Sequence, residues 1–376
     1  MKTLKDIKHL EGVKVLLRAD FNVPLNNGKV ADAYRIQSTL PTIDHLRAKG
    51  ARIVMVSHLE SNDGDNGSLE PIANHLKELG RAVDFVKDIK KAHEKIERLP
   101  AGGSILLENL RFFPGEKLND RKFAKELASL ADIYVNDAFS VSHRQHASIV
   151  AVTQFLPSYA GLQFEKEVST LSRAFHPPHP FLFILGGAKF ETKLPLLQKF
   201  SEIADSVFVA GALANDFFKV MGYEIGTSLI STADFDLSAL KNNPKLMVPV
   251  DVLDQNNEAK PADGLGKGDK IMDSGPKTVE LIGKKIAEAK FILWNGPLGL
   301  YEDGYQGATL ELAKLVSKAT DRGVETIVGG GDTLAAIATL GLLNKFTFIS
   351  TGGGAMLDFL AKETLPGIEA LNKSAE

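Results

Sequence analysis

The stretch "ETIVGGGDTLAAIATLG", residues 325–341, places three glycines and an acid between a β-branched run and a helical pattern. A glycine-rich turn lets the backbone approach an anion closely, and the helix after it presents unpaired N–H groups and the positive end of its dipole. We expect Thr333 to cap that helix and Asp332 to hold a hard cation such as Mg²⁺. Glycine-rich turns of this kind also occur for purely structural reasons. The stretch alone therefore predicts a strand–turn–helix unit and leaves phosphate binding open.

The same unit repeats along the chain, because short apolar β-branched runs alternate with segments of helical period. This alternation predicts βαβ units and parallel sheets covered on both faces. The expected strands are 14–21, 51–58, 104–111, 133–137, 181–187, 206–211, 245–253, 291–297, 325–331 and 346–351. The expected helices are 32–50, 69–80, 121–132, 192–205 and 213–222, with further helices from Gly307, Thr333 and Ala355.

The alternation stops at residues 154–180, which read as a helix flanked by prolines with no strand between them. Such a segment is typical of a connector between domains. We predict an α/β protein of two doubly wound, Rossmann-like parallel-sheet domains joined by a connecting helix and hinge. The expected parts are an N-terminal domain (1–160), the connecting helix (161–178), a C-terminal domain (179–362) and a tail (363–376) that returns to the N-terminal domain.

Length and composition limit the class of protein. A chain of 376 residues with 44% hydrophobic and 24% charged residues suits a globular protein of two domains. The absence of cysteine excludes disulfides and thiolate metal sites. The charged N-terminus does not resemble a signal peptide and no run is long enough to cross a bilayer, so we expect a cytoplasmic protein without membrane partners. A net charge of −3 argues against a nucleic-acid surface.

Arginine is concentrated in the first half, where nine of the eleven precede residue 150. Guanidinium groups suit carboxylates and phosphates, although any single arginine is more often a surface residue. Several polar side chains follow expected strands there and predict a basic pocket for a small, multiply charged anion: Arg18, Asp20, Asn22, Arg35, His58, Arg111 and Arg144. The first three alternate, so they would share one face of a strand end. His143 and His146 lack a matching cluster for a metal, and we favour anion contact or structure.

The second half carries further candidates for an anion site. "LGGAKFETK" (185–193) places Lys189 and Lys193 four residues apart, where both ammonium groups can address one anion, although solvated lysines are the usual case. "STGGGA" (350–355) adds a second glycine turn. "WNGPLGLYE" (294–302) ends in Glu302, which suits ribose hydroxyls or is simply an exposed loop acid.

Seven motifs, read in order, carry a family resemblance: "RADFNVP", "ENLRF", "HRQHAS", "LGGAKFETK", "NGPLGLYE", "GGGDT" and "STGGGA". With the "LPGIEAL" tail, the chain resembles the phosphoglycerate kinase family over essentially its whole length. The resemblance implies phosphoryl transfer between 1,3-bisphosphoglycerate and ADP, or in reverse between ATP and 3-phosphoglycerate, which is an ATP-forming step of glycolysis. It also implies Mg²⁺ bound with ATP or ADP, and a monomer.

By this resemblance, each half of the chain holds one substrate. The phosphoglycerate would be held by Asp20, Asn22, Arg35, His58, Arg111 and Arg144, within the basic pocket that also includes Arg18. The nucleotide would be held by Gly187, Lys189, Lys193, Gly211, Asn295, Glu302, Gly330, Gly331, Asp332 and Thr333, with Asp332 on Mg²⁺. The groups expected to stabilise the migrating phosphoryl group are Arg35, Lys189 and the amides of Gly331 and Gly353. We expect the two domains to close for the reaction.

Three departures from the family pattern leave a second hypothesis. After "SHL" the family usually has Gly-Arg-Pro, but here the residues are Glu60, Ser61 and Asn62, so an expected arginine is missing. "AGALA" (210–214) stands where three glycines often precede Met-Ala, and Phe348 precedes Ile349 where a histidine is frequent. The alternative is therefore a binding protein of the same fold with impaired turnover. A nicotinamide-dependent oxidoreductase is disfavoured, because no G-x-G-x-x-G opens a helix with an acid about 20 residues on.

Overall fold

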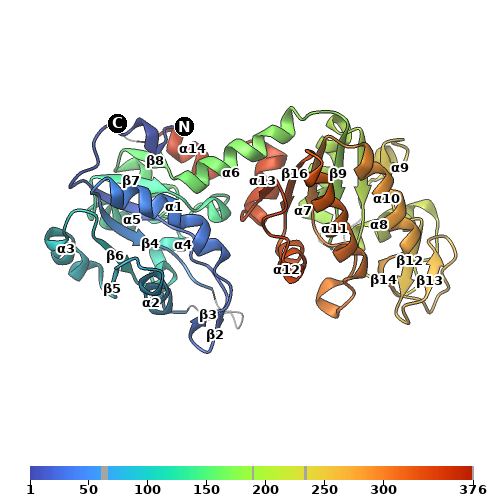
Figure 1. Cartoon of the computed structure of the whole chain (residues 1–376), viewed down its shortest axis with the longest axis horizontal. Coiled ribbons are helices and arrows are strands. Elements are labelled where there is room, and N and C mark those ends of the chain that lie inside the picture. Colours follow the sequence, from blue (N-terminus) through green and yellow to red (C-terminus); the bar gives the residue numbers. More distant parts are fainter. Residues whose placement is uncertain (61–66, 189, 233–234, 375–376) are drawn as a thin grey trace. The chain divides into compact units, whose positions relative to one another are not determined.

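The chain forms two compact units in a computed structural model that describes residues 1–60, 67–188, 190–232 and 235–374 (Figure 1). The first unit comprises Met1–Ser169 and Lys362–Glu376, and the second comprises Thr170–Ala361. Each unit is built around a six-stranded sheet whose strands all run parallel, with helices packed against it. The prediction of an α/β protein with two parallel-sheet domains is confirmed.

The first sheet has the strand order β5-β6-β4-β1-β7-β8. Its strands are short and largely buried, as the continuous apolar runs predict: β1 Lys14–Arg18, β4 Arg52–Val56, β5 Asp84–Val86, β6 Ser104–Leu107, β7 Ile133–Asn136 and β8 Ser158–Ala160. A small antiparallel hairpin, β2 Leu25–Asn26 with β3 Lys29–Val30, lies outside this sheet. Strand β1 pairs with β4 on one side and β7 on the other, so the order of strands reverses beside β1. Ligands of doubly wound sheets bind at such a reversal.

Helices of the first unit lie around this sheet (Figure 1). They are α1 Tyr34–Ala48, α2 Glu70–Glu78, α3 Ile89–Arg98, α4 Pro114–Lys117, α5 Arg121–Ala128, most of α6 Leu162–Ser172, and α14 Pro366–Asn372. The chain passes to the second unit within α6, whose first N–H groups, from Gln163 and Phe164, donate to the buried carboxylate of Asp137 at 2.9 and 3.1 Å. Helix α14 is tied to the first unit by the Gly367 N–H, which donates to the Ser142 carbonyl at 2.9 Å.

The second sheet has the order β11-β10-β9-β15-β16-β17, which is third, second, first, fourth, fifth and sixth along this unit. Counted over the strands of this sheet alone, without the three strands of a smaller sheet within residues 251–274, that is the strand order of doubly wound dinucleotide-binding folds. The strands are β9 Phe181–Leu185, β10 Ser206–Val209, β11 Leu246–Met247, β15 Phe291–Asn295, β16 Glu325–Gly329 and β17 Phe348–Ile349. Phenylalanines from β9, α7 and β15 meet in the core, where the Phe181 ring lies 5.9 Å from Phe200 and 5.1 Å from Phe291.

Helices and a second, smaller sheet complete this unit. The helices are α7 Phe190–Ile203, α8 Ala212–Met221, α9 Ser238–Lys241, α10 Pro276–Glu288, α11 Gly307–Asp321, α12 Gly331–Thr339 and α13 Gly354–Lys362. The smaller sheet is antiparallel, in the order β13-β12-β14, with β12 Asp251–Asp254, β13 Ala259–Pro261 and β14 Ile271–Ser274. Short 3-10 turns lie at Leu4–Asp6, Leu110–Phe112, Phe139–Val141, Ala151–Gln154, Arg173–Phe175 and Tyr301–Asp303.

Two expectations about the strands are wrong. The single strand expected at 245–253 is divided, since β11 joins the large sheet and β12 joins the small antiparallel one. Pro249 lies between them and has no N–H for a strand ladder, which explains the break. The connector 154–180 was expected to lack a strand, but it contains β8, whose three residues are too few to show a period. Further elements were not expected: strand β5, the β2–β3 hairpin, the small sheet, and the helices α3, α4, α9, α10 and α14.

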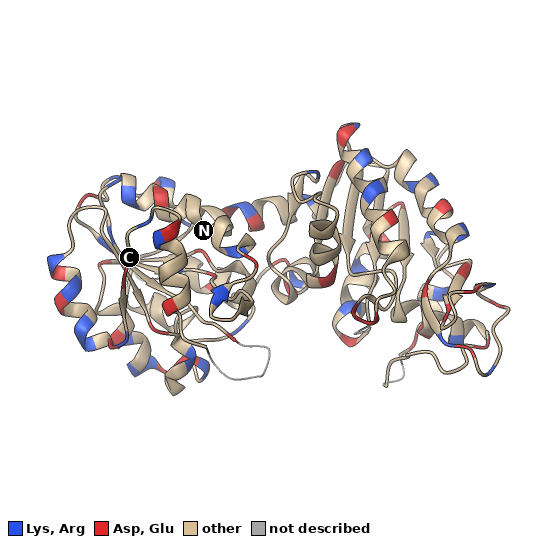
Figure 2. Cartoon of the chain, turned by 60° about the horizontal axis from the view of Figure 1, so that its bottom comes forward, with Lys and Arg blue, Asp and Glu red and all other residues tan. Residues whose placement is uncertain are grey.

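Acidic and basic residues are interspersed along the helices of both units (Figure 2). Many of them form exposed pairs, such as Lys284 with Glu280 at 2.9 Å, that contribute little to stability. Within the described ranges, the helices are too short or too polar to span a bilayer. Basic side chains gather instead beside the carboxyl ends of the strands of the first sheet, as described below.

Candidate functional site

Arg18 lies at the carboxyl end of β1 and is fully buried. Its Nε donates to Ser148 Oγ at 2.9 Å, its Nη1 donates to the Ala19 carbonyl at 2.6 Å, and its Nη2 lies 3.2 Å from His58 Nδ1. Because a guanidinium only donates, His58 must accept through Nδ1. Burial and the nearby guanidiniums, Arg18 first among them, hold the pKa of His58 well below its usual range. His58 is thus a neutral acceptor that orients Arg18.

Arg35 and Asp20 form the second part of this cluster. Arg35 belongs to the first turn of α1, so the expectation that it follows a strand is wrong. Its Nη1 lies 3.3 Å from Asp20 Oδ2, which also accepts from Ser140 Oγ at 2.6 Å. Since β1 ends at Arg18, Asp20 and Asn22 lie in the following loop rather than on the strand, and the Asn22 N–H donates to Asp20 Oδ1 at 3.3 Å. The loop, and not strand alternation, brings these side chains together.

Arg111 and Arg144 meet the carboxylate of Glu60. Glu60 Oε1 lies 3.1 Å from Arg111 Nη2 and 3.5 Å from Arg144 Nη1. The Arg111 side chain is 1% exposed, whereas those of Arg144 and Glu60 are each 40% exposed. Ser61 and Asn62, where an arginine was expected, lie outside the described residues. An acid of this chain therefore lies inside the basic cluster.

Glu116 supports the cluster from within the unit and was not expected from the sequence. Its buried carboxylate accepts from the Ser148 N–H at 2.9 Å and from Ser148 Oγ at 2.7 Å, and Ser148 in turn binds Arg18. Burial, followed by the charges of Arg111 and Arg18, lowers the pKa of His146 to about 3. No motif marks Glu116, because its role depends on contacts 32 residues away along the chain. The resulting group of arginines suits a small polyanion.

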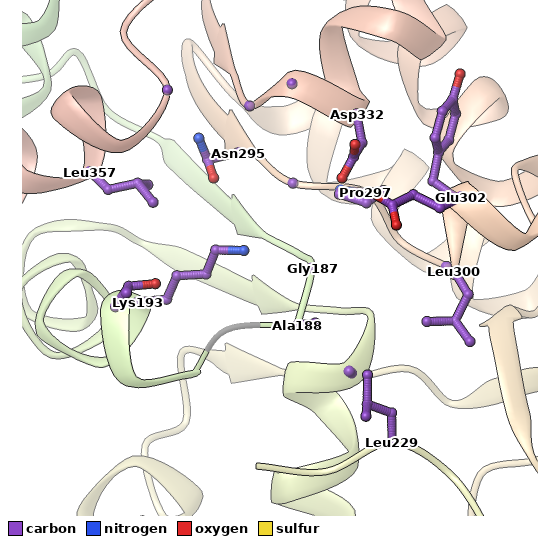
Figure 3. Close-up of a pocket in the computed structure, with 18 of the residues that line it drawn as sticks. Gly187, Ala188, Lys193, Leu229, Asn295, Pro297, Leu300, Glu302, Asp332 and Leu357 are labelled. Carbon is purple, nitrogen blue, oxygen red and sulfur yellow. The ribbon is translucent and has the colours of Figure 1, made fainter. Parts of the chain in front are cut away.

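A cavity of about 600 Å³ opens beside the second sheet (Figure 3). This volume lies in the range of small-molecule and cofactor sites. Its lining combines glycine turns, polar side chains and apolar walls: Gly187, Ala188, Thr192, Lys193, Ala212, Leu229, Asn295, Gly296, Pro297, Gly299, Leu300, Tyr301, Glu302, Asp303, Gly330, Gly331, Asp332, Gly353, Gly354 and Leu357.

Helices α7, α8, α12 and α13 all begin at or beside this lining. Their first N–H groups and dipoles favour anions there. The expectation that Thr333 caps α12 is wrong, because Gly330, with a φ of 104°, is the N-cap residue and no side chain caps the helix. Thr333 is buried instead, and its Oγ1 accepts from the Gly296 N–H at 3.1 Å. The uncapped start of α12 suits a phosphate group.

The loops after β9 and β15 approach each other where the order of the second sheet reverses. A Cβ on Gly186 would lie 2.0 Å from the Pro297 carbonyl oxygen, and one on Gly296 would lie 2.3 Å from the Gly186 carbonyl oxygen. Neither position therefore accepts a side chain unless the backbone moves. This close approach lets both loops line the same cavity.

The structure brings most of the expected nucleotide residues together. Those that line the cavity are Gly187, Lys193, Asn295, Glu302, Gly330, Gly331 and Asp332, and Gly353, expected to stabilise the migrating phosphoryl group, lines it as well. Lys193 Nζ also donates to the Gly186 carbonyl at 2.6 Å. Gly211 and Thr333 do not line it; the Gly211 N–H donates to the Leu298 carbonyl at 3.2 Å, behind the lining. Lys189 lies outside the described residues.

Three apolar side chains of the lining, Leu229, Leu300 and Leu357, were not expected from the sequence. Leu300 lies within the quoted motif "WNGPLGLYE", but Leu229 lies in a segment without a helix or strand period. Among the described residues, the carboxylates and histidines do not gather in threes that would cage a metal ion. Asp332 lines the cavity together with Glu302 and Asp303, and a carboxylate at this place is compatible with a cation that also binds ligand phosphates.

Comparisons with known proteins cover nearly the whole chain. Residues 4–363 match the sequence profile of the family described as phosphoglycerate kinase. The chain is 42% identical over 392 aligned positions to phosphoglycerate kinase of Dictyoglomus turgidum, covering 98% of each chain. It is 43% identical over 386 positions to that of a Wolbachia strain from Drosophila simulans, covering 97% of each.

Solved structures agree with these relatives. Phosphoglycerate kinase from Coxiella burnetii matches with a TM-score of 0.84 and 35% identity, covering 99% of this chain and 98% of that one. The enzyme from Pyrococcus horikoshii matches with a TM-score of 0.85 and 31% identity, with the same coverage. The likeness agrees with the architecture described above. The chain has two parallel sheets, with a basic cluster at one and a glycine-lined cavity at the other. The chain belongs to the phosphoglycerate kinase family.

Proposed function

We propose that this chain transfers a phosphoryl group between 1,3-bisphosphoglycerate and ADP, and in reverse between ATP and 3-phosphoglycerate. The observation that carries the proposal is the glycine-lined cavity of the second unit, where several helix N-termini address one space of nucleotide size. The basic cluster of the first unit supplies a separate site for the small, highly charged acceptor. Family membership supports the pairing of these two ligands.

The reaction requires positioning more than acid–base catalysis. The acceptor carboxylate is ionised at neutral pH, so no general base has to remove a proton. In-line transfer then depends on groups that hold the reactants and stabilise charge on the migrating phosphoryl group. We assign that role to Arg35, Lys189 and the amides of Gly331 and Gly353. Preorganised donors of this kind are typically worth a few kcal/mol each.

Asp332 is the residue that would hold Mg²⁺. Mg²⁺ commonly binds through one or two carboxylates together with substrate phosphates, and Asp332 lines the cavity at the start of α12. When bound, the ion neutralises charge on the phosphates. An Asp332→Asn variant is expected to bind ADP with a weaker dependence on Mg²⁺, which calorimetric titration with and without the ion would measure.

The acceptor and the nucleotide are assigned to different units, so we propose that the units close on binding both. Closure would also exclude water, which competes for the phosphoryl group. Solution scattering should then show a smaller radius of gyration with both substrates than with either one. We further propose a cytoplasmic monomer, and light scattering after size exclusion would report its mass.

A steady-state assay with Mg-ATP and 3-phosphoglycerate tests the function, with a coupled dehydrogenase to report the 1,3-bisphosphoglycerate formed. The Arg35→Gln variant is expected to lose roughly 100-fold or more of kcat, as when one stabilising donor is removed. Arg98→Gln is the matched control, because Arg98 is an exposed arginine at the end of α3 in the same unit. Nucleotide binding without turnover in the unaltered protein would support the binding-protein alternative, which the comparisons do not favour.

A further inference from the structure

Glu60 reaches both outer arginines of the basic cluster, Arg111 and Arg144. Its Oε1 is shared between Arg111 Nη2, at 3.1 Å, and Arg144 Nη1, at 3.5 Å. The backbone holds it there, because the Glu60 N–H donates to Asn22 Oδ1 at 2.9 Å. The carboxylate is therefore aimed into the cluster by the same loop residue that is assigned to the acceptor site.

The contact has the chemistry of a bound substrate. Arginine binds carboxylate and phosphate oxygens with the same N–H donors, so an oxygen of Glu60 and an oxygen of an anionic ligand compete for the same groups. Arg111 is almost fully buried, whereas Glu60 is 40% exposed. Burial leaves the arginine little room to move, whereas the glutamate can leave toward solvent, which is the arrangement expected of a displaceable occupant.

We infer that Glu60 is an internal competitor that sets the affinity of this site for its anionic acceptor. Its carboxylate takes a position that a phosphate or carboxylate oxygen of the acceptor would occupy, and binding has to break both contacts. This inference rests on the proposed function only for the identity of the acceptor. The competition itself concerns any small oxyanion bound by Arg111 and Arg144.

The size of the effect follows from the exposure of the pair. Partly exposed ion pairs contribute up to about 1 kcal/mol, which corresponds to roughly a five-fold change in affinity. Glu60→Gln removes the charge and keeps the size of the side chain and its backbone hydrogen bond. We expect the KM for 3-phosphoglycerate to fall about five-fold, with kcat and the KM for ATP changed less than about two-fold.

Two further variants separate charge from position. Glu60→Asp keeps the charge but shortens the reach by one methylene, so its KM should lie between those of the unaltered protein and Glu60→Gln. Glu94→Gln removes the same charge from an exposed position on α3 and should leave the KM unchanged. An equal fall in both glutamine variants would overturn the contact as the cause and indicate net charge instead.

Calorimetric titration with inorganic phosphate makes the inference independent of turnover. Glu60→Gln should bind phosphate about five-fold more tightly than the unaltered protein, whether or not the protein is an active kinase. Turnover with tighter phosphate binding in the variant supports both proposals. Turnover with equal or weaker phosphate binding in the variant overturns the role of Glu60 and leaves the kinase assignment intact. Tighter phosphate binding without turnover sustains the competitor and counts against the kinase.

Discussion

The two sites proposed for this chain both suit anions, but they are built from different groups. In the first unit, charge comes from arginine side chains, and Arg18, at the end of β1, is held by His58 directly and by Glu116 through Ser148. In the second unit, it comes largely from the backbone, because glycine turns open onto the starts of several helices. The first site therefore depends on the balance of charges, and the second on the path of the main chain.

This difference predicts different sensitivities. The ligand affinity of a site built from side chains should change with pH, with salt and with the removal of one charge. A site of backbone groups should be indifferent to most side-chain changes and should fail when a glycine acquires a Cβ. The following experiments test that contrast.

The largest effect is expected from Gly296→Ala in the second unit. Gly296 has a φ of 94°, and its Cβ would lie 2.3 Å from the Gly186 carbonyl oxygen. Backbone strain and the overlap should together disfavour the backbone conformation that lines the cavity by about 3 kcal/mol. The affinity for Mg-ADP should therefore fall roughly 100-fold in calorimetric titration. Gly323→Ala is the control, because it has a φ of 91° but no atom within 4 Å of its Cβ. Equal losses of affinity in the two variants would refute the close-approach argument.

Glu116→Gln should produce the next largest effect, in the first unit. It removes the buried carboxylate that accepts two hydrogen bonds from Ser148 and offsets the charge of the arginines. We expect the free energy of unfolding to fall by about 2–3 kcal/mol in urea titrations. Glu94→Gln, on the surface of the same unit, should change it by less than about 0.5 kcal/mol. A Glu116→Gln variant as stable as the unaltered protein would show that the cluster needs no counter-charge.

Acid should weaken the first unit through His146. Its pKa is about 3 in the folded protein against a usual value of 6.5, so between these values the unfolded chain binds a proton that the folded chain does not. This group's contribution is intact above about pH 6.5 and is lost by up to about 1.4 kcal/mol per pH unit as the pH falls toward 3.

The His146→Gln variant isolates that contribution. The pKa of buried Asp137 is raised to about 7, so its contribution to stability runs the other way, being present at low pH and lost as the pH rises toward 7. The unaltered protein and the His146→Gln variant share that opposing trend. The difference between their unfolding free energies should therefore grow steadily from pH 6.5 to 4. Parallel curves would mean that burial and the nearby arginines do not lower the pKa of His146.

The smallest effect is expected from salt. Raising sodium chloride from about 50 to 200 mM should weaken 3-phosphoglycerate binding several-fold, since the ligand carries a phosphate and a carboxylate and the site is built from cations. Mg-ADP has less net charge and meets mostly backbone dipoles, so its affinity should fall less. Calorimetric titrations at matched pH would compare how steeply the affinity for each ligand falls with salt concentration. Equal slopes would remove the distinction between the two kinds of site.

Local patterns in the sequence were sufficient for the alternation of strands and helices and for the glycine turns. Runs such as "FLFILGG" and "ETIVGGG" combine a buried strand with a turn that only glycine accommodates, so each can be recognised without its neighbours. The ends of the strands then pointed to Arg18, Lys193, Asn295 and Asp332, because parallel strands place their carboxyl ends along one edge. Length and the proline-flanked helix were enough to predict two domains.

Tertiary structure alone decided which of these residues meet and what supports them. Glu116 and Glu60 acquire their roles through partners far along the chain, and Thr333 was expected to cap a helix but packs under a neighbouring loop. Leu229 joins the cavity from a segment with no period at all. Local sequence encodes backbone preference and burial, which act over a few residues. Hydrogen bonds, ion pairs and cavity walls join residues that only the fold brings within a few ångströms of one another.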